Sequence, residues 1–386
     1  MPKKAEFTYH RLENNIPWEA QTPRDKTTAW LKKECQPHIA KWDREGRFPT
    51  ELIPEMAKKL QLFGVKTDPQ YGGHGGNNWM YGALCDALEW CDSGLRSFFS
   101  VQNSLGMGSI ERFGTEEQKK LWLPGMVKGE MIVAFGLTGP QWGSNPESTK
   151  TFAKKDGGDF VIRGKNHYIT NGNLAHGVIS WAHYEGALRG FFVPRDGRGF
   201  TSYSMGEKDA MRASDTAALE FDDVRIPAEN LLPGTMEKRG AYHDCLGDAR
   251  FGISWGVIGS MRFCAERALA WLEGRGLTDK QLIQYDLASI NTSIMSAQLM
   301  AHQLTRDKEE GSVSNADIST GKLLNVDLAC DVARLARRLM GGDGIMAEFG
   351  VMRHMRNLEA VYTYEGTTGH IHPLLIGRAI TGKSAF

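Results

Sequence analysis

The chain lacks the features that mark a secreted, membrane-spanning or nucleic-acid-binding protein. Its acidic and basic residues balance at 46 each, so no surface of one sign favours a nucleic acid or an anionic membrane as a partner. No apolar run approaches the roughly 20 residues that span a bilayer. Residues 1–20 contain no apolar segment and carry acidic side chains, so we expect neither a signal peptide nor a transit peptide.

Cysteine is also sparse. The six cysteines lie far apart and form no CxxC pair. In a chain of this length, such spacing is typical of reduced thiols and not of a disulfide framework or a zinc site. We therefore expect a cytoplasmic protein without a bound metal. The composition is that of a globular protein, 41% hydrophobic and 24% charged, and 386 residues suit two or three packed subdomains.

The spacing of apolar residues divides the chain into three segments. In residues 1–130 a spacing of three to four predicts helices at 29–42, 54–62, 79–91 and 96–108. In residues 131–235 alternating or continuous apolar residues predict strands at 131–137, 160–169, 177–183, 188–193 and 217–224, as in a small barrel or sandwich. In residues 236–386 helical spacing returns at 247–273, 278–307 and 315–339, lengths that predict an antiparallel bundle. This order of elements predicts an α+β fold.

The sequence Tyr364-Glu365-Gly366-Thr367 carries the strongest local signal for chemistry. An acid in apolar surroundings has a raised pKa, so Glu365 is a candidate general base near neutral pH. Gly366 allows a cofactor or a second backbone to approach closely. In isolation, an acid that caps a helix explains the same residues equally well.

Beside other motifs of the chain, this box resembles the YEGT motif of the acyl-CoA dehydrogenases. The helix–strand–helix order is similar to that family's fold from end to end. Within the family, residues 250–257, 358–361 and 377–382 most resemble glutaryl-CoA dehydrogenases. The likeness covers nearly the whole chain. It implies an N-terminal helical domain, a middle β domain and a C-terminal four-helix bundle.

The resemblance also implies the reaction. In this family a carboxylate removes the substrate's α-proton while a β-hydride passes to FAD, and reduced FAD passes its electrons to electron-transfer flavoprotein or another acceptor. Some members place the base directly before an arginine of the first bundle helix, but here that position is Ala249, before Arg250. The resemblance therefore assigns the base to Glu365.

The same comparison with the family implies the residues that bind the ligands. Arg96, with Ser97 and Glu89, matches the residues that bind a distal substrate carboxylate, for which a planar guanidinium is well suited. The substrate set is Arg96, Ser97, Glu89, Ser144, Tyr364 and Arg250. The FAD set is Thr138, Tyr168, Ile169, Thr170, Gly341, Gly342, Gly344 and Thr367. Glu89 and Tyr364 favour a decarboxylating member, which releases CO2 and gives crotonyl-CoA.

Assembly follows from two arguments. The helix predicted at 247–273 carries large apolar residues on more than one face, namely Trp255, Ile258, Met261, Phe263 and Trp271, and such a helix needs packing partners. The family resemblance implies a homo-oligomer, a tetramer built as a dimer of dimers.

The chain also departs from the family pattern near the expected flavin contacts. The family's RxQFGxPL segment is replaced by the shorter residues 273–280. Asp343 introduces a negative charge into the glycine turn at 341–344, where a phosphate is expected. These departures predict FAD that is held more loosely than usual. They also keep open a second function, that of a lyase of the same fold, similar to an acyl-CoA desulfinase, or of a non-redox protein that binds a CoA thioester.

Overall fold

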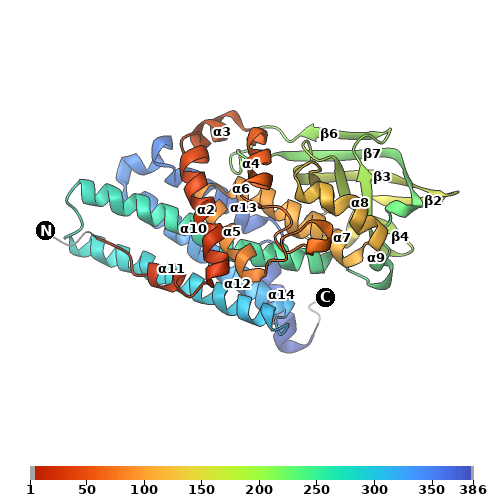
Figure 1. The fold of residues 1–386 in the computed structure, drawn as a ribbon. Coiled ribbons are helices and arrows are strands. Elements are labelled where there is room, and N and C mark those ends of the chain that lie inside the picture. The colour runs from red at the N-terminus through yellow and green to blue at the C-terminus, as the bar shows by residue number, and fades with distance from the viewer. Residues whose placement is uncertain (1–4, 384–386) are drawn as a thin grey trace.

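The computed structural model describes residues 5–383 and shows helices at both ends of the chain and a sheet between them in sequence. The two helical segments lie against each other as one body, and the sheet extends from one end of it (Figure 1). The predicted order of helices, strands and helices is therefore confirmed. No helix within residues 5–383 is both long enough and apolar enough to cross a membrane.

The N-terminal segment is entirely helical. Its helices are α1 (His10–Glu13), α2 (Trp18–Trp30), α3 (Ile39–Glu45), α4 (Ile53–Lys58), α5 (Asn78–Cys91), α6 (Ser93–Ser100), α7 (Gly108–Phe113) and α8 (Glu116–Val127), with π-helical turns at Leu31–Cys35 and Val101–Met107. The connection from α5 to α6 is tight because the Asp92 carboxylate accepts a hydrogen bond from Gly94 N at 2.8 Å and caps the new helix. This cap places Glu89 near the end of one helix and Arg96 in the first turns of the next.

The middle segment forms one seven-stranded sheet with the order β1-β4-β2-β3-β7-β6, in which β5 pairs with β4. Its strands are β1 (Val133–Gly136), β2 (Phe152–Asp156), β3 (Asp159–Thr170), β4 (Gly177–Tyr184), β5 (Ala187–Pro194), β6 (Phe200–Ser204) and β7 (Thr216–Pro227). Strand β3 loses register with β7 between Asn166 and Ile169. Such a bulge changes the direction of the side chains beside it, and Tyr168 lies within it.

The C-terminal segment contains the longest helices. They are α10 (Tyr242–Gly274), α11 (Gln281–Glu309) and α12 (Asn315–Leu339), followed by α13 (Val351–Thr363) and α14 (Ile371–Thr381), while the short α9 (Gly234–Glu237) precedes them. Helix α10 packs against α5 as well as against α11 and α12. One large apolar core therefore joins the two helical segments, and a smaller core lies within the sheet.

Sequence periodicity missed elements that bury few side chains. Helix α2 begins at Trp18, well before the predicted start at residue 29, because its first turns are polar and include Pro23. Strands β2 and β6 were not predicted, since most of their residues are exposed or half-exposed and show no clear alternation. The apolar residues of α10 that predicted external partners are mostly covered by the chain itself. Trp255, Ile258, Met261 and Phe263 are all buried, which corrects that part of the argument for assembly.

Candidate active site

Glu365 lies in the tight loop between α13 and α14. Its backbone is in the left-handed region with φ of 54°, and Gly366 follows with φ of 99°. The loop closes on the preceding helix through a hydrogen bond from Thr368 N to the Tyr362 carbonyl at 2.8 Å. Few non-glycine residues adopt such a backbone, and those that do are often found at functional sites.

One oxygen of the Glu365 carboxyl group is buried without a partner in the described part of the chain. This atom, Oε2, is out of contact with solvent and has no hydrogen-bond partner within residues 5–383. Burial raises the pKa of Glu365 above its ordinary value of 4.5, although Arg96, Lys322 and Arg250 act in the opposite direction. An unpaired carboxyl group with a raised pKa has the properties of a general base.

Arg96 is fully buried and directed toward the same loop. Its Nε donates to Glu89 Oε2 at 2.7 Å, and its Nη2 donates to the Tyr364 hydroxyl. Ser93 Oγ donates to the other oxygen of Glu89 at 2.9 Å. Arg96 Nη1 has no hydrogen-bond partner in the described part of the chain, which leaves one donor of this cluster unused.

This arrangement depends on a glycine of α10. A Cβ atom at Gly256 would lie 2.2 Å from Glu89 Oε2 and 3.2 Å from Arg96 Nε. Only glycine therefore leaves room for the buried ion pair. Glu89 already neutralises the charge of Arg96 within the folded chain.

The end of β3 meets α6 at the same place. Ser97 Oγ and Thr170 Oγ1 are 3.5 Å apart, so a hydroxyl from the sheet and one from the Arg96 helix face each other. Tyr168 is 71% exposed, and its φ of 61° and the bulge of β3 direct its ring away from the sheet. Ile169 packs into the core of the sheet, so its side chain does not face the site and only its backbone is available to a ligand.

Other predicted residues lie in loops. Thr138 follows β1 and accepts a hydrogen bond from His167 N at 2.9 Å through its carbonyl, which ties this loop to β3. Ser144 is exposed in the same loop. Thr367 lies in the Glu365 loop, where its hydroxyl faces the Thr363 carbonyl at 3.5 Å. Arg250 donates from Nε to the Glu365 carbonyl at 2.8 Å, so it contacts the backbone of the candidate base.

The glycine turn is separate from this cluster. Gly341, Gly342 and Gly344 follow the C-terminal end of α12, and the helix runs about 26 Å from Lys322, which lies beside Glu365, to that end. The charge of Asp343 is not free, because Arg275 donates to it at 2.7 Å and Trp271 Nε1 at 2.8 Å. Asp343 therefore adds less negative charge to the turn than its sequence position suggests.

Sequence reasoning missed Lys322. Its side chain is fully buried, and its Nζ donates to the carbonyls of Tyr364 and Gly366 on both sides of Glu365. A signal was available in the sequence, because Ile318, Lys322 and Asn325 recur at helical spacing on the buried face of α12. A lysine on such a face is unusual and indicates a buried partner.

Three domain models of one protein family match most of the chain. The acyl-CoA dehydrogenase N-terminal, middle and C-terminal domain models match residues 18–130, 134–224 and 240–381. A probable acyl-CoA dehydrogenase of Bacillus subtilis is 30% identical over 94% of this chain and 98% of its own.

Solved structures are similar along the whole chain. A glutaryl-CoA dehydrogenase of Mycobacterium smegmatis is 41% identical, with a TM-score of 0.93 over 97% of this chain and 98% of its own. A structure of glutaryl-CoA dehydrogenase from the same organism in complex with FADH2 is 39% identical, with a TM-score of 0.95 over 100% of both chains. The chain belongs to the acyl-CoA dehydrogenase family.

Proposed function

We propose that this protein is an FAD-dependent dehydrogenase that oxidises the α,β-bond of a short acyl-CoA with a distal carboxylate, with glutaryl-CoA as the leading substrate. The observation that carries the proposal is a pair of buried, unpartnered polar atoms in one cluster. Glu365 Oε2 can accept a proton, and Arg96 Nη1 can donate to an anion. The cluster thus offers a base for one end of an acyl chain and a donor for the other.

The residues at the end of β3 fit a flavin. The exposed ring of Tyr168 and the hydroxyl of Thr170 provide an aromatic surface and a polar group, which suit a planar ring system with polar edges. Thr138 and the backbone of Ile169 would complete this side of the cofactor. The similar glutaryl-CoA dehydrogenase structure with bound FADH2 supports this assignment. When bound, FAD would accept the β-hydride of the substrate.

Glu365 would take the α-proton of the thioester. Its raised pKa makes the carboxylate a stronger base. Arg250 donates to the Glu365 carbonyl, which helps to fix the position of the carboxylate relative to the substrate. Ser144, exposed in the loop after β1, would contact the CoA side of the substrate.

Arg96 and Ser97 would bind the distal carboxylate. Arg96 Nη1 is the unused donor, while Glu89 and the Tyr364 hydroxyl hold the guanidinium in place. The substrate carboxylate would then share Arg96 with Glu89. In the proposed reaction, breakage of the bond to this carboxylate after oxidation would release CO2, and the γ-carbon left with the electron pair would take up one proton to give crotonyl-CoA. The similarity to glutaryl-CoA dehydrogenases supports this step.

Assembly and electron transfer belong to the same proposal. Helix α11 presents three exposed apolar side chains, Leu282, Tyr285 and Leu299, whose burial in a homotetramer would be favourable. Because the glycine turn lies far from Glu365 within one chain, Gly341, Gly342 and Gly344 would serve a cofactor at the contact between copies. Electron-transfer flavoprotein is the proposed acceptor.

Two measurements test the proposed function. The cofactor is extracted from purified protein and identified by chromatography; one non-covalent FAD per chain is expected, and protein that takes up no added FAD would contradict the proposal. The holoenzyme is then mixed anaerobically with glutaryl-CoA, butyryl-CoA or 3-sulfinopropionyl-CoA. Flavin reduction should be fastest with glutaryl-CoA. Conversion of the sulfinate without flavin reduction would instead support the lyase.

A further inference from the structure

A buried lysine lies behind the Glu365 loop, and the proposed reaction gives it no role. Lys322 of α12 is fully buried, and its Nζ donates to the Tyr364 carbonyl and, at 2.7 Å, to the Gly366 carbonyl. Arg250 donates to the carbonyl between them, that of Glu365 itself, at 2.8 Å. Three consecutive carbonyls around the base therefore each accept a hydrogen bond from a buried cation.

The loop needs such support. Glu365 and Gly366 both have positive φ, which a non-glycine residue keeps only where the surroundings hold it. Gly366 is also confined, because a Cβ atom there would lie 3.2 Å from Ile371 and 3.3 Å from His372. The carbonyls at 364 and 366 both point toward Lys322, so one ammonium group fixes the peptide planes on both sides of the carboxylate residue.

The charge of Lys322 is not neutralised by contact. Within residues 5–383 no carboxylate forms an ion pair with it, and its hydrogen-bond partners are carbonyl oxygens. Burial, Arg250 and Arg96 lower the pKa of Lys322 to about 7, whereas Glu365 acts to raise it, so Lys322 carries its full charge below neutral pH. Burial raises the pKa of Glu365, whereas Lys322 is among the groups that lower it. Each group thus favours the charged form of the other.

We propose that Lys322 is a positioning residue for Glu365, which it holds through the two flanking carbonyls and beside which it supplies a buried positive charge. This inference rests on the proposed function, in which Glu365 is the base. It explains why a lysine stands on the buried face of α12 without an acidic partner.

The other groups that face the carboxylate differ from Lys322. Arg96 of α6 and Arg250 of α10 keep their charge at any working pH and are assigned to the substrate. His372 of α14 is neutral near pH 7, because burial and the charges of Lys322 and Arg250 lower its pKa to about 3. Lys322 is therefore the cation whose removal changes the field at Glu365 without removing a proposed substrate contact.

The experiment measures the rate of flavin reduction in the holoenzyme with glutaryl-CoA across the pH range in which the protein is stable. Three variants separate the two parts of the proposal: Lys322→Met removes both charge and donor, Lys322→Gln keeps a donor without charge, and Lys322→Arg keeps both. The rate of flavin reduction should rise with pH as Glu365 loses its proton. In the Met and Gln variants we expect this rise to occur about one pH unit higher than in the wild type, so that the rate is about tenfold lower at pH values below the rise. In the Arg variant the rate should rise at the same pH as in the wild type. KM should change little, because Lys322 does not contact the substrate.

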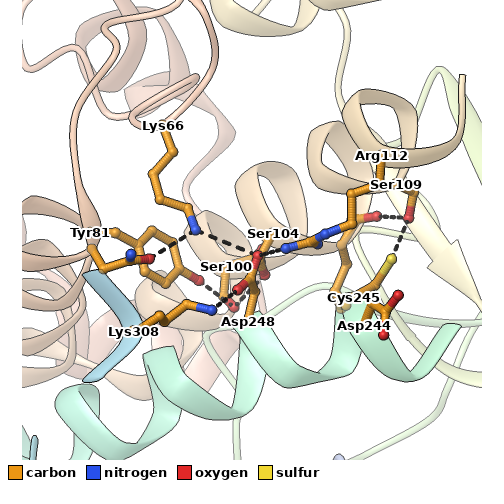
Figure 2. Close-up of polar contacts among 12 residues, drawn as sticks. Lys66, Tyr81, Ser100, Ser104, Ser109, Arg112, Asp244, Cys245, Asp248 and Lys308 are labelled. Atoms are coloured by element: carbon orange, nitrogen blue, oxygen red, sulfur yellow. Dashed lines mark hydrogen bonds and ion pairs between the residues drawn. The ribbon is translucent and has the colours of Figure 1, made fainter. Parts of the chain in front are cut away.

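Lys308→Met is the matched control. Lys308 is another largely buried lysine, and it pairs with Asp248 of α10 at 2.8 Å, in a separate cluster (Figure 2). Its loss should lower stability and leave the pH dependence unchanged. If Lys322→Met does not fold, the contrast between the Gln and Arg variants carries the test. A rate of flavin reduction that rises at the same pH in the Gln variant, the Arg variant and the wild type would overturn the proposal.

Glu365→Gln distinguishes the two possible failures. If Glu365→Gln retains the wild-type rate of flavin reduction, the assignment of the base is wrong and the proposed function fails first. If Glu365→Gln abolishes the reaction while the Lys322 variants keep the wild-type pH dependence, the base stands and only the role of Lys322 is contradicted.

Discussion

Asp248 and Glu365 are both carboxylic acids that three cationic side chains surround, yet their pKa values move in opposite directions. Burial opposes the ionisation of Asp248, but Lys66, Arg112 and Lys308 more than offset it and lower the pKa. Burial also opposes the ionisation of Glu365, and there it prevails over Arg96, Lys322 and Arg250. The number of nearby cations therefore does not decide the outcome.

Direct contact with the cations decides the direction of each pKa shift. The Asp248 carboxylate lies 2.5 Å from Arg112, 2.8 Å from Lys308 and 3.5 Å from Lys66, and Figure 2 shows these side chains converging on it. Each cation near Glu365 instead bonds elsewhere: Arg96 to Glu89, and Arg250 and Lys322 to backbone carbonyls. Asp248 forms ion pairs with Arg112, Lys308 and Lys66, whereas Glu365 forms no ion pair within residues 5–383 and its Oε2 has no hydrogen-bond partner there.

The largest expected effect follows from loss of the free carboxylate. Glu365→Gln keeps the shape of the side chain but cannot accept a proton as a base. The rate of flavin reduction should fall by about 100- to 10,000-fold, while FAD content and thermal stability remain near wild type. A stopped-flow measurement checks this, and a variant that reduces its flavin at the wild-type rate would remove Glu365 from the mechanism.

At Asp248, loss of the carboxylate is expected to lower stability and not the rate of the reaction. Asp248→Asn leaves three cations around a neutral group, and breaking a buried ion pair costs about 3 kcal/mol or more of the free energy of unfolding. Because the pKa of folded Asp248 is lowered, its contribution is full at neutral pH and fades below about pH 4, as the unfolded carboxyl group becomes protonated. Denaturant unfolding at several pH values measures this. An equally stable variant would show that the cluster is not structural.

The third prediction concerns one cation near Glu365. Arg96→Met removes the anion donor and leaves Glu89 buried without its partner. Turnover of glutaryl-CoA should fall by about 30-fold, the lower end of the cost of truncating a buried charge pair, because Glu89 already shares Arg96. Butyryl-CoA should be affected less. The double variant Arg96→Met/Glu89→Gln controls for the orphaned carboxylate, and an equal loss for both substrates in it would argue against a distal-acid site.

The smallest effect is expected for one of the cations around Asp248. Lys308→Met removes a single contact, and Lys66 and Arg112 remain in place. The free energy of unfolding should fall by about 1 kcal/mol, with no change in the rate of flavin reduction. Equilibrium unfolding beside a rate assay checks both parts. A loss as large as that of Asp248→Asn would mean that the three cations do not share the carboxylate.

Much of the fold was predictable because its long helices bury continuous apolar faces. The helix predicted at 315–339 coincides with α12, and the strand predicted at 160–169 lies within β3. Elements with polar or short sequences were not predictable in this way, as α2, β2 and β6 show. Their place in the fold depends on neighbours that are distant in the sequence.

The candidate site was predictable only in part. The box around Glu365 stands out locally, but the pairing of Arg96 with Glu89 depends on the space that Gly256 leaves on a third helix. The carbonyls held by Lys322 belong to a loop more than forty positions away in the chain. Such contacts arise from packing between helices, and no local pattern of residues encodes them.

The most direct test of the central claim, that Glu365 is an unpaired base with a raised pKa, is the pH dependence of the first turnover. The rate of flavin reduction is measured with saturating glutaryl-CoA, so that it reports on the enzyme–substrate complex. The account predicts a rate that rises with pH, with a half-maximum above the ordinary glutamate value of 4.5, and no such rise in Glu365→Gln. A rate that is already maximal at pH values near 4.5, or a limb that persists in Glu365→Gln, would contradict it.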